Sequence, residues 1–165
     1  MNKEIIKTDI AIIGAGPSGC MAASILRDSG KKVLLIDKSD FPRHKPCAGG
    51  LTPKTVENLP FEISTLEQHT SEKMLFKFTN GKTVDLNHHL GACKMVIRED
   101  FDNFFFSYVR SKGAVFLKGK IKKIKDSDNV VDVETDNKKI QCNYLIGADG
   151  ANSTVRRLTT NLKFT

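Results

Sequence analysis

The sequence predicts an α/β fold in which a parallel sheet of Rossmann-like βαβ type is extended by an antiparallel β-meander. An apolar, β-branched run at 10–13 is followed by a glycine-rich turn, a helix and a second apolar run at 32–36, which is the order of a βαβ unit. Three strand-like segments, at about 119–126, 129–136 and 138–146, are separated by turns rich in Asp and Asn. With 165 residues, of which 39% are hydrophobic, the chain can bury the core of about one domain.

The glycine-rich turn has the spacing G-x-G-x-x-G. Gly14 allows a tight turn out of the strand, Gly16 lets the backbone approach a pyrophosphate closely, and Gly19 lets the helix pack against the strand. Pro17 suits the first helical turn, whose free amides and positive dipole end favour phosphates. Gly30 is expected to end the helix. The turn therefore predicts a site for an anionic ligand.

Asp37 stands at the tip of the second strand, 18 residues after Gly19. A carboxylate there accepts hydrogen bonds from an adenosine ribose and repels a 2′-phosphate. This context predicts dinucleotide binding, although it does not separate NAD from FAD, and a βαβ unit with an incidental glycine-rich turn is the alternative. The candidate residues of this first site are Gly14, Ala15, Gly16, Pro17, Ser18, Gly19, Asp37 and Lys38.

The middle of the chain predicts a long loop and a hairpin. Three prolines and two glycines argue against regular structure over 38–55, a length that is usually functional in a loop. Residues 56–73 are expected to be short, mixed helix and connector. Residues 74–86 are expected to form a hairpin around Asn80-Gly81.

A helix is expected from about residue 98 to Gly113, and a strand over 114–117. The aromatic residues of the expected helix recur at i, i+3, i+4 and i+7, which predicts a stripe that faces the core. The stripe consists of Phe101, Phe104, Phe105 and Tyr108.

A second glycine turn, Gly147-Ala148-Asp149-Gly150, follows the last strand of the meander and precedes Ser153-x-Val155-Arg156. Asp149 can accept a hydrogen bond from a cofactor hydroxyl, and the glycines let the backbone come close. Alone, this segment is an ordinary turn before a helix. Paired with the first turn, it resembles the mid-chain motif of the flavoprotein class that contains aromatic hydroxylases, halogenases and isoprenoid reductases.

The loop distinguishes among these flavoproteins. The run Phe41-Pro42-Arg43-x-Lys45-Pro46-Cys47-Ala48-Gly49-Gly50-Leu51 resembles the signature of the geranylgeranyl reductase family. Arg98-x-x-Phe101-Asp102 resembles the next motif of that family. A halogenase would show a GWxWxIP segment, and this sequence contains no Trp.

The resemblance implies FAD as the cofactor, with Gly14–Gly19 on the pyrophosphate and Asp37 on the ribose. It implies that Cys47, Ala48 and Gly50 line the flavin through their backbone, and that Arg98 reaches the phosphate–ribityl region. The main chain of Ile121 is implied on the adenine side, and Asp149 with Gly150 at the riboflavin end. The implied activity is reduction of C=C bonds of isoprenoid (geranylgeranyl) chains in lipid or prenyl-diphosphate substrates, with NAD(P)H or a reduced ferredoxin-type donor.

The resemblance also implies a domain plan. Residues 1–55 and 95–165 are expected to be two parts of the FAD-binding domain, and 56–94 a segment of a substrate domain that interrupts it. Because members of that family are longer, we expect this chain to be the N-terminal portion of such a protein. A partner chain would then complete it, and whether this portion is active by itself stays open. An aromatic monooxygenase and a non-catalytic dinucleotide-binding module are the alternative functions.

Cys47 is a candidate catalytic residue, as a redox or acid group, although a free Cys is more often a small buried hydrophobe. His44, in the same loop, is a candidate proton donor. The four cysteines show no CxxC spacing, so no metal site is expected. The other histidines are expected to be surface or structural residues; they are His69, His88 and His89.

The formal net charge is +7, and lysines crowd residues 118–125. A solvated strand face or a guarded sheet edge is the first interpretation, and a phospholipid-facing patch the second. No nucleic-acid partner is expected, because no aromatic residues interleave with these lysines. Neither a signal peptide nor a membrane-spanning helix is predicted, which indicates a cytoplasmic location with at most peripheral membrane contact.

Overall fold

The structure is a computed structural model that describes residues 5–87, 93–127 and 129–159. The chain divides into two compact units. Unit 1 comprises Met1–Phe41 and Phe104–Thr165, and unit 2 comprises Pro42–Asn103. The helix α3 (Arg98–Ser111) contributes residues to both. The functional division into 1–55, 56–94 and 95–165 stays a prediction.

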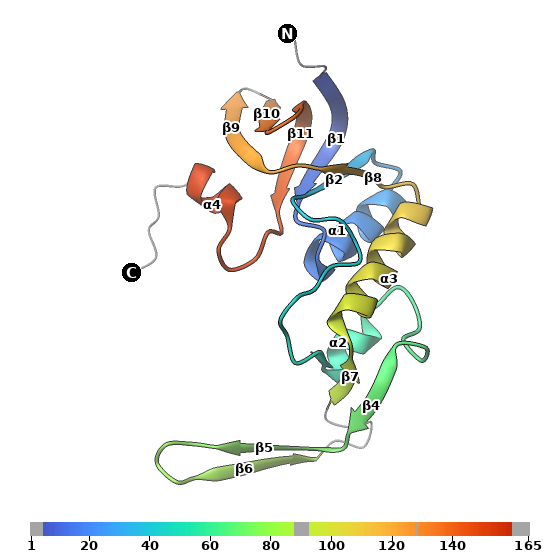
Figure 1. Cartoon of the computed structure of the whole chain (residues 1–165), viewed down its shortest axis with the longest axis vertical. Coiled ribbons are helices and arrows are strands. Elements are labelled where there is room, and N and C mark those ends of the chain that lie inside the picture. Colours follow the sequence, from blue (N-terminus) through green and yellow to red (C-terminus); the bar gives the residue numbers. More distant parts are fainter. Residues whose placement is uncertain (1–4, 88–92, 128, 160–165) are drawn as a thin grey trace. The chain divides into compact units, whose positions relative to one another are not determined.

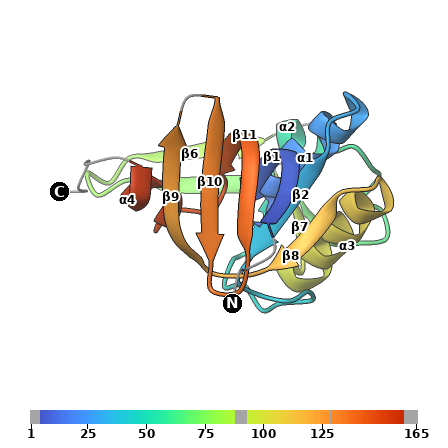
Figure 2. The ribbon, with the colours of Figure 1, turned by 90° about the horizontal axis from the view of Figure 1, so that it is seen from above.

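Unit 1 is built on a six-stranded sheet with the order β8-β2-β1-β11-β10-β9, which is seen from above in Figure 2. The strands β8, β2, β1 and β11 run parallel to one another, whereas β10 and β9 extend the sheet beyond β11 as an antiparallel meander. The predicted α/β fold with a parallel sheet and a meander is confirmed. The strands are β1 (Ile5–Ile13), β2 (Val33–Asp37), β8 (Val115–Lys118), β9 (Ile121–Ser127), β10 (Val130–Thr135) and β11 (Lys139–Gly147).

The helix α1 (Pro17–Asp28) connects β1 to β2 and packs against both strands (Figure 1). It begins at Pro17, as predicted, and Gly30 follows its C-cap Ser29 with a φ of +76°. Only glycine adopts that left-handed conformation without strain, which explains where the helix ends. Among the described residues, no helix is long and apolar enough to cross a membrane.

The core of unit 1 lies along the centre of the sheet, where the last four residues of β1 and most of β2 are buried. Burial on both faces is typical of parallel strands and explains why these two segments are apolar. One side of this core also receives residues of the meander and of α4 (Thr154–Thr159). Its members are Ala11, Ile13, Leu34, Ile36, Ile121, Val133, Ile140, Cys142 and Val155.

The aromatic stripe predicted on α3 is partly wrong. Phe101 and Phe105 are buried, but Phe104 is 37% exposed. Val109 is fully buried instead and continues the i, i+4, i+8 spacing of the two buried rings. Phe106 is also buried, because its ring stacks on that of Phe41 at 4.3 Å between centroids.

Unit 2 contains a three-stranded antiparallel sheet with the order β3-β7-β4. Its strands are β3 (Gly50–Leu51), β4 (Glu67–Ser71) and β7 (Cys93–Val96), and α2 (Pro53–Glu57) follows β3. The expectation of no regular structure over 38–55 is therefore wrong at its end. The expectation of short, mixed helix and connector over 56–73 also does not include β4, whose sequence is short and polar and shows no alternation of apolar and polar residues.

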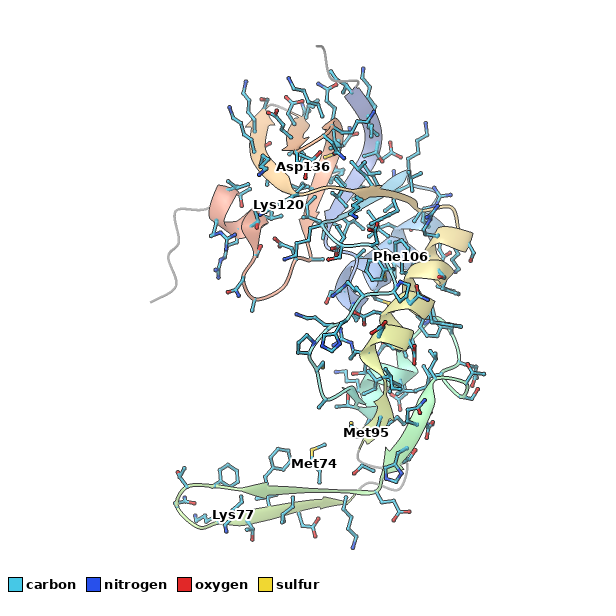
Figure 3. The ribbon with its side chains drawn as sticks, in the orientation of Figure 1. Met74, Lys77, Met95, Phe106, Lys120 and Asp136 are labelled. Atoms are coloured by element: carbon cyan, nitrogen blue, oxygen red, sulfur yellow. The ribbon has the colours of Figure 1, made fainter. Side chains whose placement is uncertain are left out.

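The predicted hairpin is confirmed as β5 (Lys73–Lys77) and β6 (Thr83–Asn87), which pair antiparallel. Gly81 has a φ of +81°, so the Asn80-Gly81 signal marks the position where the chain reverses. Met74 and Lys77 project from opposite faces of this ribbon, as Figure 3 shows. The hairpin therefore has one largely apolar face and one polar face.

Candidate dinucleotide-binding site

Two glycine turns meet at one end of the parallel strands of unit 1. The amide of Gly14 donates to the carbonyl of Ile36 at 2.7 Å, and the amide of Ala148 donates to the carbonyl of Ile13 at 2.7 Å. Gly14 has a φ of +102°, and a Cβ on it would lie 2.3 Å from the carbonyl oxygen of Ala148. Only glycine fits that position. The two turns therefore lie against each other at this end of the sheet.

Gly19 brings α1 against the turn. A Cβ on Gly19 would lie 1.8 Å from the carbonyl oxygen of Gly14. The expected role of Gly19 in close packing of helix and strand is therefore confirmed. Gly16 is the N-cap of α1 with an ordinary φ of −73°, so its backbone conformation does not itself require glycine. Close approach of a phosphate at Gly16 stays a prediction.

The N-terminus of α1 has the chemistry of an anion site. Gly16 has no side chain with which to cap the helix, and the first turn contains no acidic residue. Pro17 occupies the position where a missing amide costs nothing, and Ser18 is exposed. The amides of the first turn and the positive end of the helix dipole favour a bound phosphate.

The carboxylate of Asp37 is fixed beside the first turn. Its Oδ2 accepts a hydrogen bond from the amide of Ala15 at 2.9 Å, and its Oδ1 accepts one from the amide of Ser39 at 3.0 Å. An ionised carboxylate has about four acceptor sites, so it can accept further bonds from hydroxyl groups. Lys38 is exposed. Asp37 thus keeps free acceptor capacity beside the start of α1, and its contact with a ribose stays a prediction.

Asp149 has a structural role that the sequence did not reveal. Its Oδ2 accepts hydrogen bonds from the amides of Thr154 and Val155, the latter at 3.2 Å. Its Oδ1 accepts a bond from the Ser153 hydroxyl. Asp149 therefore satisfies the first two amides of α4, whereas the Ser153 hydroxyl accepts from the amide of Arg156 at 3.0 Å and is the N-cap. Its predicted contact with a cofactor hydroxyl stays a prediction, as does that of Gly150, which is exposed with a φ of +84°.

Ile121 begins β9 with its side chain 6% exposed in the core. Only its main chain can contact a ligand, as the resemblance implies, and that contact stays a prediction. The lysines around it occupy the edge strand of the sheet, where Lys123 and Lys125 lie opposite Glu134 and Asp132. This arrangement supports the interpretation as a guarded sheet edge.

In unit 2, the loop that carries Cys47 is held on β7 by its two glycines. The carbonyl of Gly49 accepts a bond from the amide of Val96 at 2.9 Å, and a Cβ on Gly49 would lie 1.9 Å from the Val96 oxygen. A Cβ on Gly50 would lie 2.7 Å from the sulfur of Cys93. These glycines are therefore required by packing, whatever the loop binds.

The Cys47 thiol is exposed beside polar groups. The amide of Gly49, and after it the Arg98 guanidinium, lower the pKa of this thiol because both donate hydrogen bonds to the thiolate. In contrast, burial raises the pKa of Cys142. Ala48 is exposed next to Cys47, as is His44.

The other described cysteines and His69 occupy packing or surface positions. Cys20 and Cys93 are buried, as packing residues would be. His69 is exposed, which agrees with the expected surface role. The sites of His88 and His89 lie outside the described residues.

An ion-pair cluster in unit 2 was missed at the level of sequence. Arg98 donates to Asp102 through Nε at 2.8 Å and Nη2 at 3.1 Å. Nη2 of Arg43 lies 3.3 Å from Oδ2 of the same carboxylate. The i, i+4 spacing of Arg98 and Asp102 on a predicted helix is the signal that could have indicated the pair.

The fold and the two converging turns define a dinucleotide-binding α/β protein. Residues 7–163 match the model of the FAD binding domain family, and the chain belongs to that family. Its residues fit FAD. The first turn of α1 contains no acidic residue and suits the pyrophosphate, and the carboxylate of Asp37 beside it suits the ribose. The prediction of a flavoprotein with FAD as its cofactor is confirmed.

Relatives with similar sequences include a geranylgeranyl diphosphate reductase. An uncharacterised protein of Methanosarcina barkeri is 40% identical over 152 residues, covering 92% of this chain and 39% of the relative. A geranylgeranyl diphosphate reductase of Rhodobacter capsulatus is 34% identical over 158 residues, with the same coverage of each chain. The chain thus spans about two fifths of the length of these relatives, and the resemblance to geranylgeranyl reductases is confirmed.

The fold also recurs in a solved structure. The p-nitrophenol 4-monooxygenase PnpA of Pseudomonas putida superposes with a TM-score of 0.80 at 19% identity, covering 98% of this chain and 45% of that one. At this identity the similarity supports the fold alone. The architecture is therefore shared with a protein named as a monooxygenase.

Proposed function

We propose that this chain is the FAD-binding part of a reductase that saturates C=C bonds of isoprenoid chains. The observation that carries the proposal is the combination of two converging glycine turns with the loop Pro46-Cys47-Ala48-Gly49-Gly50-Leu51, which is pinned to β7. The turns are common to many flavoproteins, whereas the loop resembles that of geranylgeranyl reductases. The relative named geranylgeranyl diphosphate reductase supports the same substrate class.

The residues that would hold FAD fall into two groups. In the first group, Gly14–Gly19 and Asp37 would bind the adenosine diphosphate half, with the main chain of Ile121 near the adenine. In the second group, Arg98 would reach the phosphate–ribityl region and the main chain of Cys47, Ala48 and Gly50 would line the flavin, with Asp149-Gly150 at the riboflavin end. When bound and reduced by two electrons from the electron donor, the flavin would supply the hydride that adds to one carbon of the double bond.

The second carbon requires a proton, and we propose that the Cys47 thiol donates it. Its pKa is lowered by the Gly49 amide and the Arg98 guanidinium, so the thiolate left after proton transfer is stabilised. The thiol is exposed, so solvent can return the proton. The cysteine gains and loses only a proton, and the two electrons come from the hydride.

The proposed substrate is a prenyl diphosphate or a lipid that carries a prenyl chain. A net charge of +7 favours association with an anionic headgroup and with an anionic membrane surface. The electron donor would be NAD(P)H or a reduced ferredoxin-type protein. We further propose that 56–94 contributes to the substrate domain.

Anaerobic turnover tests the proposal. The full chain is loaded with FAD, reduced with dithionite and mixed with geranylgeranyl diphosphate, and the product is analysed by mass spectrometry. The proposal predicts a gain of two hydrogens per saturated bond, with a large loss of rate in Cys47→Ala but not in Cys142→Ala. FAD uptake without any saturated product would overturn the reductase assignment. A gain of oxygen under air would indicate a monooxygenase instead, and failure to take up FAD would indicate a non-catalytic module.

A further inference from the structure

The carboxylate of Asp102 is fully buried within unit 2, with a side-chain exposure of 0%. A buried charge is costly unless it is paired and hydrogen-bonded. Asp102 meets this requirement twice, because the guanidinium groups of Arg98 and Arg43 both lie on it. Both arginines are themselves largely buried, at 17% and 19% exposure.

The geometry of Arg98 is unusually constrained for an arginine side chain. Its Nε and Nη2 donate to the two different oxygens of Asp102, which fixes the plane of the guanidinium. The same guanidinium also acts on the Cys47 thiol, whose pKa it lowers through hydrogen bonding and its positive charge. Arg98 therefore joins a buried carboxylate to an exposed sulfur, and its five donors in a planar fork suit this double role.

We propose that Asp102 is a positioning residue, whose buried carboxylate holds the Arg98 guanidinium in the orientation that places it against the Cys47 thiol. One carboxylate between two guanidinium groups leaves a net positive charge in the cluster, and Arg98 directs it to the sulfur. This role concerns the acidity of the thiol. It goes beyond the proposed reductase function and holds whether or not Cys47 protonates a substrate.

The direction in which the pKa of Cys47 shifts on neutralising Asp102 distinguishes a positioning role of Asp102 from a purely electrostatic one. The groups that act on the thiol are the Gly49 amide and the Arg98 guanidinium, which lower its pKa, and the Asp102 carboxylate, which raises it. If Asp102 acted only through its charge, neutralising it would lower the pKa of Cys47 further. If Asp102 acts by holding Arg98, neutralising it lets the guanidinium leave and raises the pKa of Cys47.

Alkylation of the full chain by iodoacetamide, followed against pH, measures this sign. The rate at Cys47 is the difference between each protein and its Cys47→Ser counterpart, which removes the contribution of the other thiols. Asp102→Asn should move the midpoint of the pH profile upward and lower the rate at pH 7 by about threefold or more. The matched control is Asp100→Asn, an exposed acid in the first turn of the same helix, which should leave the midpoint unchanged.

A midpoint that stays or moves downward in Asp102→Asn would overturn the proposal. Near-ultraviolet circular dichroism checks that the variant is folded. If it is not, Arg98→Lys is measured, because Lys keeps the charge but lacks the fork that spans both carboxylate oxygens. The proposal expects an upward midpoint there too, and an unchanged midpoint would overturn it. FAD uptake is measured separately, so failure of the flavoprotein function is distinguishable from failure of this role.

Discussion

Substituting Gly19 by Ala tests the packing that brings α1 against the glycine turn. At a helix position with free space around it, replacing Gly by Ala stabilises the protein by about 1 kcal/mol, because Ala has the higher helix propensity. At Gly19 the new Cβ would lie 1.8 Å from the carbonyl oxygen of Gly14, which is backbone and cannot rotate away. Overpacking typically costs about 1–3 kcal/mol and more where nothing can yield, so we expect a net loss of about 2 kcal/mol.

Urea denaturation of Gly19→Ala and the unchanged protein measures that loss, and a fluorescence titration measures FAD affinity. The control is Gly30→Ala, at the other end of α1, where φ is +76° but no atom lies within 4 Å of the new Cβ. It should lose about 1 kcal/mol through backbone strain and keep its FAD affinity. Gly19→Ala should lose stability and FAD affinity together, because relieving the overlap displaces the helix N-terminus. A Gly19→Ala protein as stable as the original, with the same FAD affinity, would refute this reasoning.

Three further predictions concern single side chains. Asp37→Ala should weaken FAD binding by about 10–100-fold in calorimetry, because hydrogen bonds to a charged group are worth about 1.5–3 kcal/mol. The control Asp40→Ala removes an exposed ion pair with Lys118 and should leave FAD affinity unchanged. Equal losses of affinity in the two variants would contradict the role of Asp37. Cys47, with its pKa lowered, should become alkylated at lower pH than Cys142, with its pKa raised by burial, and peptide mapping that shows the reverse order would be inconsistent with the two environments. Asp149→Ala should cost about 1–2 kcal/mol of stability in thermal unfolding, because the amides of Thr154 and Val155 lose their acceptor, and an unchanged stability would contradict this role of Asp149.

The sequence predicts the parts of unit 1 whose structure is set by local rules. The strand, turn, helix and acid around Gly14–Gly19 obey backbone requirements that only certain residues meet, and their burial follows from continuous apolar runs. The hairpin is predicted because Asn80-Gly81 specifies a chain reversal. These elements could be placed without knowledge of their neighbours.

The missed features depend on contacts between distant residues. The strand β4 has the sequence EQHTS, which lacks alternation and forms only because β7 offers a pairing edge. The helical spacing predicts that Phe104 is buried, but Phe104 is exposed in the structure. Phe106, which lies outside the predicted stripe, is buried because its ring stacks on that of Phe41. The contact of Arg43 with Asp102 likewise joins a loop to a helix that sequence spacing cannot connect.

A crystal structure of this chain grown with FAD tests most directly whether the two glycine turns form the cofactor site. It should show the pyrophosphate against the first-turn amides of α1 and the adenosine ribose on Asp37. A pyrophosphate bound anywhere else would contradict the assignment of this site.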